Sequence, residues 1–125
     1  LKKLDPKLWK IYYSKNKSNK IIATLLVFLE NQSIEYYIPA CLEKYKNTQI
    51  LSLLTYRSII DAINNDYKIY NFGFTWLNQT GVYNFKKKWG CDEVNIKYLI
   101  KIRKNHLKNA KEVFKKNKYF YIAPF

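Results

Sequence analysis

Residues 67–90 constrain the fold of this chain more than any other stretch. The first eight of them place apolar side chains on both sides of an extended backbone, which predicts a central strand with a covering layer on each side. Gly73 removes a side chain near the end of this strand, so another group can approach its backbone closely. A short polar connection leads to a helix over 81–89, which Thr80 caps and Gly90 ends in a left-handed conformation.

This strand, loop and helix resemble the C-terminal half of FemAB-like transferases, which have the GNAT fold. The resemblance rests on the Phe-Gly that ends the strand and on the Phe-Lys-x-x-Trp-Gly of the helix. The matching residues are Tyr70, Phe72, Gly73, Gly81, Phe85, Lys86, Trp89 and Gly90. The resemblance implies an α/β fold with a mixed, twisted sheet.

Composition fits a single domain over residues 1–125, because a chain of 125 residues can build one core. Its 23 basic and 9 acidic residues give a net charge of +14, which attracts nucleic acid, anionic lipid or acidic polymers. The codon usage of an AT-rich genome also explains the abundant Lys, Asn, Ile and Tyr, and we favour this explanation of the charge. With only two cysteines and no apolar run long enough to span a membrane, we expect a cytoplasmic protein with free thiols.

The order of predicted elements supports the resemblance. Three strands joined by tight turns predict an antiparallel meander at 8–15, 21–30 and 34–42. A helix follows, capped by Asn47 or Thr48 and running to about Asn65. Because strand, helix and strand follow one another with this spacing, 34–42 and 67–74 should be parallel neighbours.

Two further predictions concern the helix after the meander and the end of the chain. The helix has an apolar stripe that we expect to face the sheet, formed by Leu53, Tyr56, Ile60 and Ile63. Residues 94–103 alternate as a strand, and residues 104–125 predict a basic helix and a tail. Compared with the GNAT core, the opening strand and two helices are absent. This absence suggests a fragment, and it leaves room for a partner domain or a homo-oligomer.

The resemblance also implies where the chemistry takes place. In the GNAT fold, the strands corresponding to 34–42 and 67–74 separate at their C-terminal ends, and the acyl donor enters the wedge between them. Unpaired backbone N–H groups in such a wedge can hold the carbonyl of the donor. Pro39 cannot donate to a ladder and so fits one that opens here, although an ordinary bulge explains it equally well.

Lys44 and Lys46 are candidate ligands for the phosphates of the donor. Family members that use coenzyme A carry a Gly-rich turn before the central helix, where free N–H groups bind the pyrophosphate. The corresponding stretch here, 43–49, has no glycine, which disfavours acyl-coenzyme A relative to aminoacyl-tRNA. The two lysines can meet a phosphate by charge attraction; as the alternative, they are solvated surface charges.

Lys86 is the strongest catalytic candidate. At roughly 100° per residue it points to within about 40° of the apolar side of its helix, whereas Lys87 and Lys88 point toward solvent. In related aminoacyltransferases the matching Phe-Lys pair is implicated in stabilising an oxyanion, which implies a catalytic role for Lys86 and a substrate contact for Phe85. The alternative is a lysine whose stem lies along apolar surface while its ammonium group reaches water.

Three other residues are candidate substrate contacts. Gly73 leaves space at the end of its strand, Tyr37 is expected to face the wedge, and Trp76 is expected to line the acceptor site. Packing in the core is the alternative for both aromatic residues. The single histidine and the two cysteines lack the spacing of a metal site, and no general base can be named.

The sequence therefore predicts an acyltransferase that moves an acetyl, other acyl or aminoacyl group to an amine or hydroxyl. Acyl-coenzyme A or aminoacyl-tRNA would be the donor, so tRNA is a candidate partner. A cell-envelope glycan or peptide precursor is a candidate acceptor. The competing prediction is a GNAT-like module without catalytic activity, which binds nucleic acid or an acidic glycan through its basic surface.

Overall fold

The computed structural model describes residues 5–76 and 78–96. The elements are η1 (Pro6–Leu8), β1 (Trp9–Lys15), β2 (Ile21–Glu30), β3 (Ser33–Cys41), η2 (Glu43–Thr48), α1 (Ile50–Asn64), β4 (Ile69–Asn71) and α2 (Thr80–Lys87). The chain divides into two compact units, 1–92 and 93–125. In the second unit, residues 93–96 form neither helix nor strand, and the rest of the predicted strand over 94–103 and the helix and tail over 104–125 lie outside the described residues.

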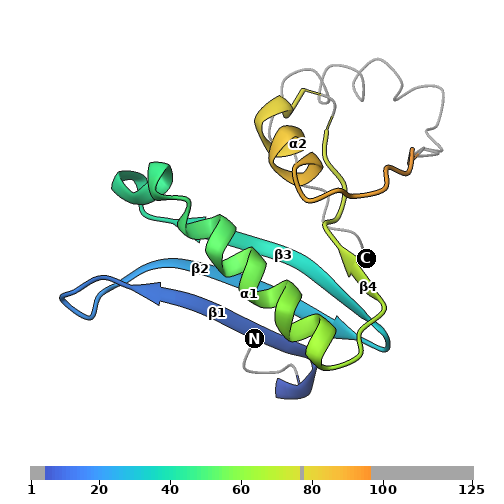
Figure 1. Cartoon of the computed structure of the whole chain (residues 1–125), viewed down its shortest axis with the longest axis horizontal. Helices are drawn as coiled ribbons and strands as arrows, with labels where there is room; N and C mark the ends of the chain where they lie inside the picture. Colours follow the sequence, from blue (N-terminus) through green and yellow to red (C-terminus); the bar gives the residue numbers. More distant parts are fainter. Residues whose placement is uncertain (1–4, 77, 97–125) are drawn as a thin grey trace, which may run out of the picture. The chain divides into compact units, whose positions relative to one another are not determined.

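The sheet has the strand order β1-β2-β3-β4 (Figure 1). The first three strands pair antiparallel through the turns after Lys15 and Glu30, which confirms the predicted meander. Strand β4 pairs with β3 in parallel, Ser33 opposite Ile69, which confirms the predicted crossover through α1. The sheet is therefore mixed, as the fold prediction requires.

Helix α1 covers one face of the sheet and closes the core (Figure 1). The sheet contributes Tyr12, Ala23, Leu25, Val27, Ile34 and Tyr36, and α1 contributes Leu54 and Ala62. Among residues 5–76 and 78–96, no helix has the length and apolarity needed to cross a bilayer.

The predicted apolar stripe of α1 is wrong. Leu53, Tyr56 and Ile63 are 57%, 55% and 62% exposed. The buried side consists instead of Leu54, Thr55, Ser58 and Ala62. Three of these side chains are small. The hydroxyls of Thr55 and Ser58 form hydrogen bonds within the helix.

Two hydrogen bonds show how these hydroxyls tolerate burial. Thr55 Oγ1 donates to Leu51 O at 2.8 Å, and Ser58 Oγ donates to Thr55 O at 2.7 Å. A hydroxyl that bonds the preceding turn of its own helix enters the core without an unsatisfied donor. A prediction from side-chain polarity alone therefore gives the wrong face of α1 as the one that packs on the sheet.

The predicted helix starts also need correction. Residues proposed as the cap of α1, Asn47 and Thr48, lie within η2, and α1 begins after Gln49, which has φ +58°. Helix α2 begins at Thr80 itself, so Thr80 is not its cap. Gly90 has φ +71° and follows the last turn of α2, as predicted.

Strand β4 is shorter than predicted and lies at the edge of the described sheet, not at its centre. The chain turns after Asn71, whose side-chain oxygen accepts a hydrogen bond from Gly73 N at 2.8 Å. Gly73 has φ +65°, a conformation that glycine adopts without strain. This turn directs the following residues away from β3 and toward α2.

Candidate functional site

Strand β4 pairs with β3 along its whole length, but only the first three residues of β3 take part. Their ladder consists of Ser33, Ile34 and Glu35 opposite Ile69, Tyr70 and Asn71. Beyond it β4 ends, whereas β3 continues to Cys41 with no strand on that side among the described residues. Because β4 ends at Asn71, the C-terminal part of β3 has no partner strand on this side among the described residues, and Figure 1 shows the chain after β4 departing from the line of β3.

A bulge in β3 lies just beyond its ladder with β4. Val27 pairs with Tyr36 and Leu26 pairs with Ile38, so Tyr37 is an extra residue in β3. Pro39, which we expected to bulge or lose its partner, pairs with Leu25. The irregularity is thus two residues earlier than predicted, where a bulge can change the direction of the backbone groups of β3.

Tyr36, not Tyr37, contacts the residues that follow β4. The ring of Tyr36 lies 5.4 Å from that of Phe72 and 6.4 Å from that of Phe85, measured between centroids. The ring of Tyr37 packs edge-on against Phe28 of β2 at 4.7 Å. Sequence alternation alone could not choose between the two tyrosines, because the bulge shifts which residue points to which side.

Gly73 lies beside this opening. A Cβ atom at Gly73 would be 4.0 Å from Tyr36 O, an ordinary van der Waals distance. Glycine is therefore favoured at position 73 because of the positive φ, whereas a side chain there would have room. Any side chain placed there would extend toward the backbone of β3 beyond its ladder with β4.

Lys86 reaches back from α2 to the loop after β4. Its Nζ donates to Gly73 O at 3.2 Å and to Phe74 O at 3.1 Å. Lys86 is half-buried, whereas Lys87 and Lys88 are exposed, which matches the orientation predicted from helical periodicity. Burial lowers the pKa of Lys86, and the neighbouring Cys91 thiol acts in the opposite direction. The ammonium group thus holds two carbonyls of the loop.

Aromatic side chains fill the space between this loop and α2. Phe72 stacks on Trp89 at 6.3 Å, and Phe85 meets Trp89 edge-on at 6.2 Å. Trp76 is 40% exposed, and its ring contacts Phe74 at 6.1 Å. The structure therefore brings Phe85, Lys86 and Gly73 together, with Trp76 joined to them through Phe74.

Hydrogen-bonded hydroxyls buried under α1 support the same region, and sequence analysis did not predict the contact between them. Ser58 Oγ and Tyr70 Oη are 2.6 Å apart, which ties β4 to α1. Burial raises the pKa of Tyr70 to about 12. Burial also raises the pKa of Tyr36 to about 12, with a smaller contribution from Tyr70. Both rings are therefore neutral anchors at ordinary pH.

The predicted phosphate ligands lie elsewhere, on η2. Lys46 forms an ion pair with Glu43 at 2.5 Å, and Lys44 lies over the ring of Tyr45 at 4.9 Å from its centroid. Element η2 follows the C-terminal end of β3 and precedes α1. These lysines therefore follow the C-terminal end of β3, and their contacts with Glu43 and Tyr45 stay within η2.

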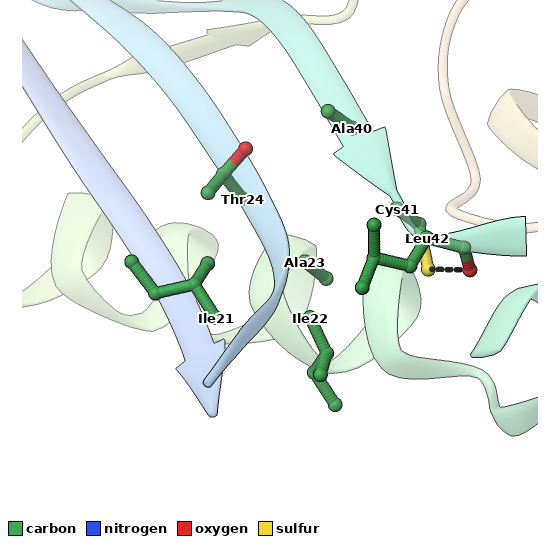
Figure 2. Close-up of a pocket in the computed structure, with 7 residues that line it drawn as sticks. All are labelled: Ile21, Ile22, Ala23, Thr24, Ala40, Cys41 and Leu42. Carbon is green, nitrogen blue, oxygen red and sulfur yellow. Dashed lines mark hydrogen bonds between the residues drawn. The ribbon is translucent and has the colours of Figure 1, made fainter. Parts of the chain in front are cut away.

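A cavity of about 200 Å³ lies where β2 begins and β3 ends (Figure 2). It is lined by Ile21, Ile22, Ala23, Thr24, Ala40, Cys41 and Leu42. Its only sulfur is that of Cys41, whose Sγ donates to Leu42 O at 3.4 Å. The lining is mostly apolar, and none of the predicted site residues belongs to it.

Comparisons with solved structures identify the fold. A mutant of the BH1408 protein from Bacillus halodurans matches 78% of this chain and 68% of its own, with TM-score 0.64 and 10% identity. An acetyltransferase of the GNAT family from Staphylococcus aureus Mu50 matches 75% of this chain and 60% of its own, with TM-score 0.60 and 16% identity. An aminoglycoside acetyltransferase, HMB0005, from an uncultured soil metagenomic sample matches 70% and 62%, with TM-score 0.55 and 13% identity.

No family model and no curated protein matches this sequence. The chain spans 60% to 68% of the length of these three solved structures. At such low identity their likeness concerns the arrangement of elements. The mixed sheet, the parallel crossover through α1 and these neighbours together show that the chain has a GNAT-like α/β fold.

Proposed function

We propose that this chain is an acyltransferase of the FemAB-like kind, or the donor-binding part of one. It would move an acetyl, other acyl or aminoacyl group to an amine or hydroxyl, with a cell-envelope glycan or peptide precursor as a candidate acceptor. The observation that carries the proposal is the early end of β4 in a GNAT-like sheet, which leaves β3 beyond Glu35 without a partner strand on that side among the described residues. That opening is where the resemblance places the acyl donor.

The backbone of β3 beyond Glu35 would bind the donor. This part of β3 has no strand on its outer side among the described residues, and the bulge at Tyr37 interrupts its regular ladder. Backbone N–H groups in such a position can hold a carbonyl and stabilise the oxyanion that forms on it. The acceptor amine or hydroxyl then adds to the carbonyl carbon, and the tetrahedral intermediate releases the thiol or the ribose hydroxyl of the donor.

Lys86 would supply positive charge beside this reaction and hold the loop that borders it. Two of its hydrogen bonds go to carbonyls of that loop, and an ammonium group has a third N–H that could donate to a substrate oxygen. Phe85, Trp76 and Gly73 would border the acceptor. Lys44 and Lys46, after the C-terminal end of β3, would meet the phosphates of acyl-coenzyme A or of aminoacyl-tRNA. Tyr37 would contribute through its backbone at the bulge and not through its ring.

A ligand-binding experiment with matched glycine variants tests the proposal. Acetyl-coenzyme A at about 100 times its Kd should stabilise the chain by about 2.7 kcal/mol, measured by thermal unfolding, with ATP as the control polyanion. Gly73→Asn places a side chain in the opening while tolerating the positive φ, and should weaken donor binding by about tenfold or more. Gly90→Asn is the matched control, since Gly90 has φ +71° and open space around its Cβ position.

Two results would reject the proposal. One is that neither acetyl-coenzyme A nor an aminoacyl-tRNA stabilises the chain. The other is that both glycine variants bind the donor as the parent chain does. A response to aminoacyl-tRNA alone would select the aminoacyl donor.

A further inference from the structure

The charged residues of β1, β2, β3 and their connections are segregated along the sheet. The basic end comprises the turn between β1 and β2 together with η2. It carries Lys15, Lys17, Lys20, Lys44 and Lys46. The opposite end, where β2 meets β3 and α1 meets β4, carries the acidic residues Asp5, Glu30, Glu35, Asp61 and Asp66 together with the basic residues Lys7, Lys10, Arg57 and Lys68. Five lysines and the one carboxylate of Glu43 give the basic end a net charge of +4, whereas the opposite end, with four basic and five acidic residues, has a net charge of −1.

Hydrogen bonds fix the turn and join it to η2. Asn16 Oδ1 accepts from Ser18 N and from Lys20 N, both at 3.0 Å, and Asn16 N donates to Lys20 O at 2.9 Å. Asn16 Nδ2 donates to Tyr45 Oη at 3.5 Å. Figure 1 shows the turn and η2 at the same end of the sheet. The lysines of the two segments thus belong to one surface.

Positive charge on this surface is not neutralised by carboxylates. Glu43 is the one acidic residue of the basic end within the described ranges, and it pairs with Lys46. Lys15, Lys17, Lys20 and Lys44 form no ion pair with any described residue. The pKa of Tyr45 is lowered by the Asn16 hydrogen bond and then by the Lys44 and Lys20 ammonium groups. Anions near Tyr45 would therefore be attracted from more than one side.

Two lysines of the basic end each lie over a tyrosine ring. Lys15 lies over the ring of Tyr13 at 5.7 Å from its centroid, and Lys44 lies over the ring of Tyr45 at 4.9 Å. Tyr13 is 55% exposed, so much of its ring is open to a ligand. Cations that track a phosphate backbone, interleaved with aromatic rings that stack on bases, are the usual composition of a single-strand binding surface.

We propose that the basic end binds single-stranded nucleic acid, with phosphates at Lys15, Lys17, Lys20 and Lys44 and bases against Tyr13 and Tyr45. This interaction goes beyond acyl transfer and does not require it. An anionic membrane is the other polyanion to consider. The paired ring and cation favour a nucleic acid, because bases use the ring faces and lipid headgroups do not.

The test measures binding of a fluorescently labelled single-stranded RNA of about 12 nucleotides to the full chain by anisotropy, between 50 and 200 mM salt. Lys20→Ala/Lys44→Ala should lower the affinity about tenfold and reduce the slope of log K against log salt by about 1.4. Lys7→Ala/Lys68→Ala is the matched control, because it removes the same charge from exposed lysines at the opposite end. It should retain the parent affinity and slope.

Equal losses in the two double variants would overturn the proposal in favour of diffuse charge. So would absence of RNA binding at 50 mM salt, or binding to phosphatidylserine vesicles without binding to RNA. For the stacking contact, Tyr45→Leu should weaken RNA binding about fivefold or more, whereas Tyr45→Phe should retain it. Equal affinity of these two variants would reject stacking on Tyr45. Failure here would count against a phosphate contact of tRNA with Lys44, whereas stabilisation by acetyl-coenzyme A tests the acyltransferase proposal separately.

Discussion

Lys86 illustrates what one residue position reveals before and after the structure. Helical periodicity correctly predicted that it is less exposed than Lys87 and Lys88. Periodicity could not show that its ammonium group bonds Gly73 O and Phe74 O, because those carbonyls come from a loop 12 and 13 residues earlier. The proposed catalytic role therefore has to be separated from a structural one.

We expect Lys86→Ala to reduce both turnover and stability. Loss of the bonds to two carbonyls should lower the free energy of unfolding by about 1–2 kcal/mol, measured by urea denaturation. Loss of positive charge beside the oxyanion should lower turnover by about 10²- to 10³-fold. Lys88→Ala is the control and should change neither quantity, because Lys88 is exposed. A destabilised Lys86→Ala enzyme that kept full turnover would show that Lys86 only holds the loop.

At the scale of elements, the sequence predicted the meander to within about two residues. The turns after Lys15 and Glu30 are marked by polar residues, and β2 is almost wholly apolar. The predictions failed where tertiary contacts decide the outcome. The face of α1 was misassigned because Thr55 and Ser58 satisfy their hydroxyls locally, and the choice between Tyr36 and Tyr37 depended on a bulge.

The corrected face of α1 can be measured with adjacent leucines. Leu54 is 5% exposed and lies in the core, so Leu54→Ala should lower the free energy of unfolding by about 2–4 kcal/mol. Leu53 is 57% exposed, so Leu53→Ala should cost no more than about 0.5 kcal/mol. Urea denaturation followed by circular dichroism compares the two. If Leu53→Ala lowered the free energy of unfolding more than Leu54→Ala, the face predicted from the sequence would be the buried one.

On the scale of the whole molecule, hydroxyl groups connect α1 to strands at both edges of the sheet. Tyr12 of β1 donates to Asp61 Oδ2 at 3.1 Å, and Tyr70 of β4 shares a hydrogen bond with Ser58. The pKa of Tyr12 is raised by burial and then by its hydrogen bond to Asp61. Stability at alkaline pH should therefore report on the assembly of α1 with the entire sheet.

We expect stability to be lost as pH rises from about 10 toward about 12. Tyr36 and Tyr70 keep their protons up to about pH 12 in the folded chain, whereas unfolded tyrosine ionises near pH 10. Their contribution is complete below pH 10 and disappears above it. The lowered pKa of Lys86 has the opposite effect. Burial of the charged ammonium group destabilises the folded chain, and this destabilisation is relieved as pH rises through the lowered pKa. Urea denaturation between pH 8 and 11 measures the net slope.

Tyr70→Phe isolates the tyrosine contribution, because it removes one ionisable group and leaves the ring. Its stability should fall less steeply with pH above 10 than that of the parent chain. Tyrosinate absorbance at 295 nm should show correspondingly one fewer late-titrating group. Parallel stability profiles for the two chains would mean that Tyr70 ionises in the folded state as it does in the unfolded state.

The brief pairing of β3 with β4 also determines the order in which the chain assembles. Partners in the meander are joined by tight turns, whereas Ser33 and Ile69 are 36 residues apart in the chain and pair only after α1 has formed. Contacts between distant residues form late in folding because closing a long loop costs entropy. Because β4 is held to β3 by only three paired positions, it should open easily. The amide protons of β4 should therefore exchange faster than those of β2. The segment that borders the proposed donor site would then be the last to fold and the first to open.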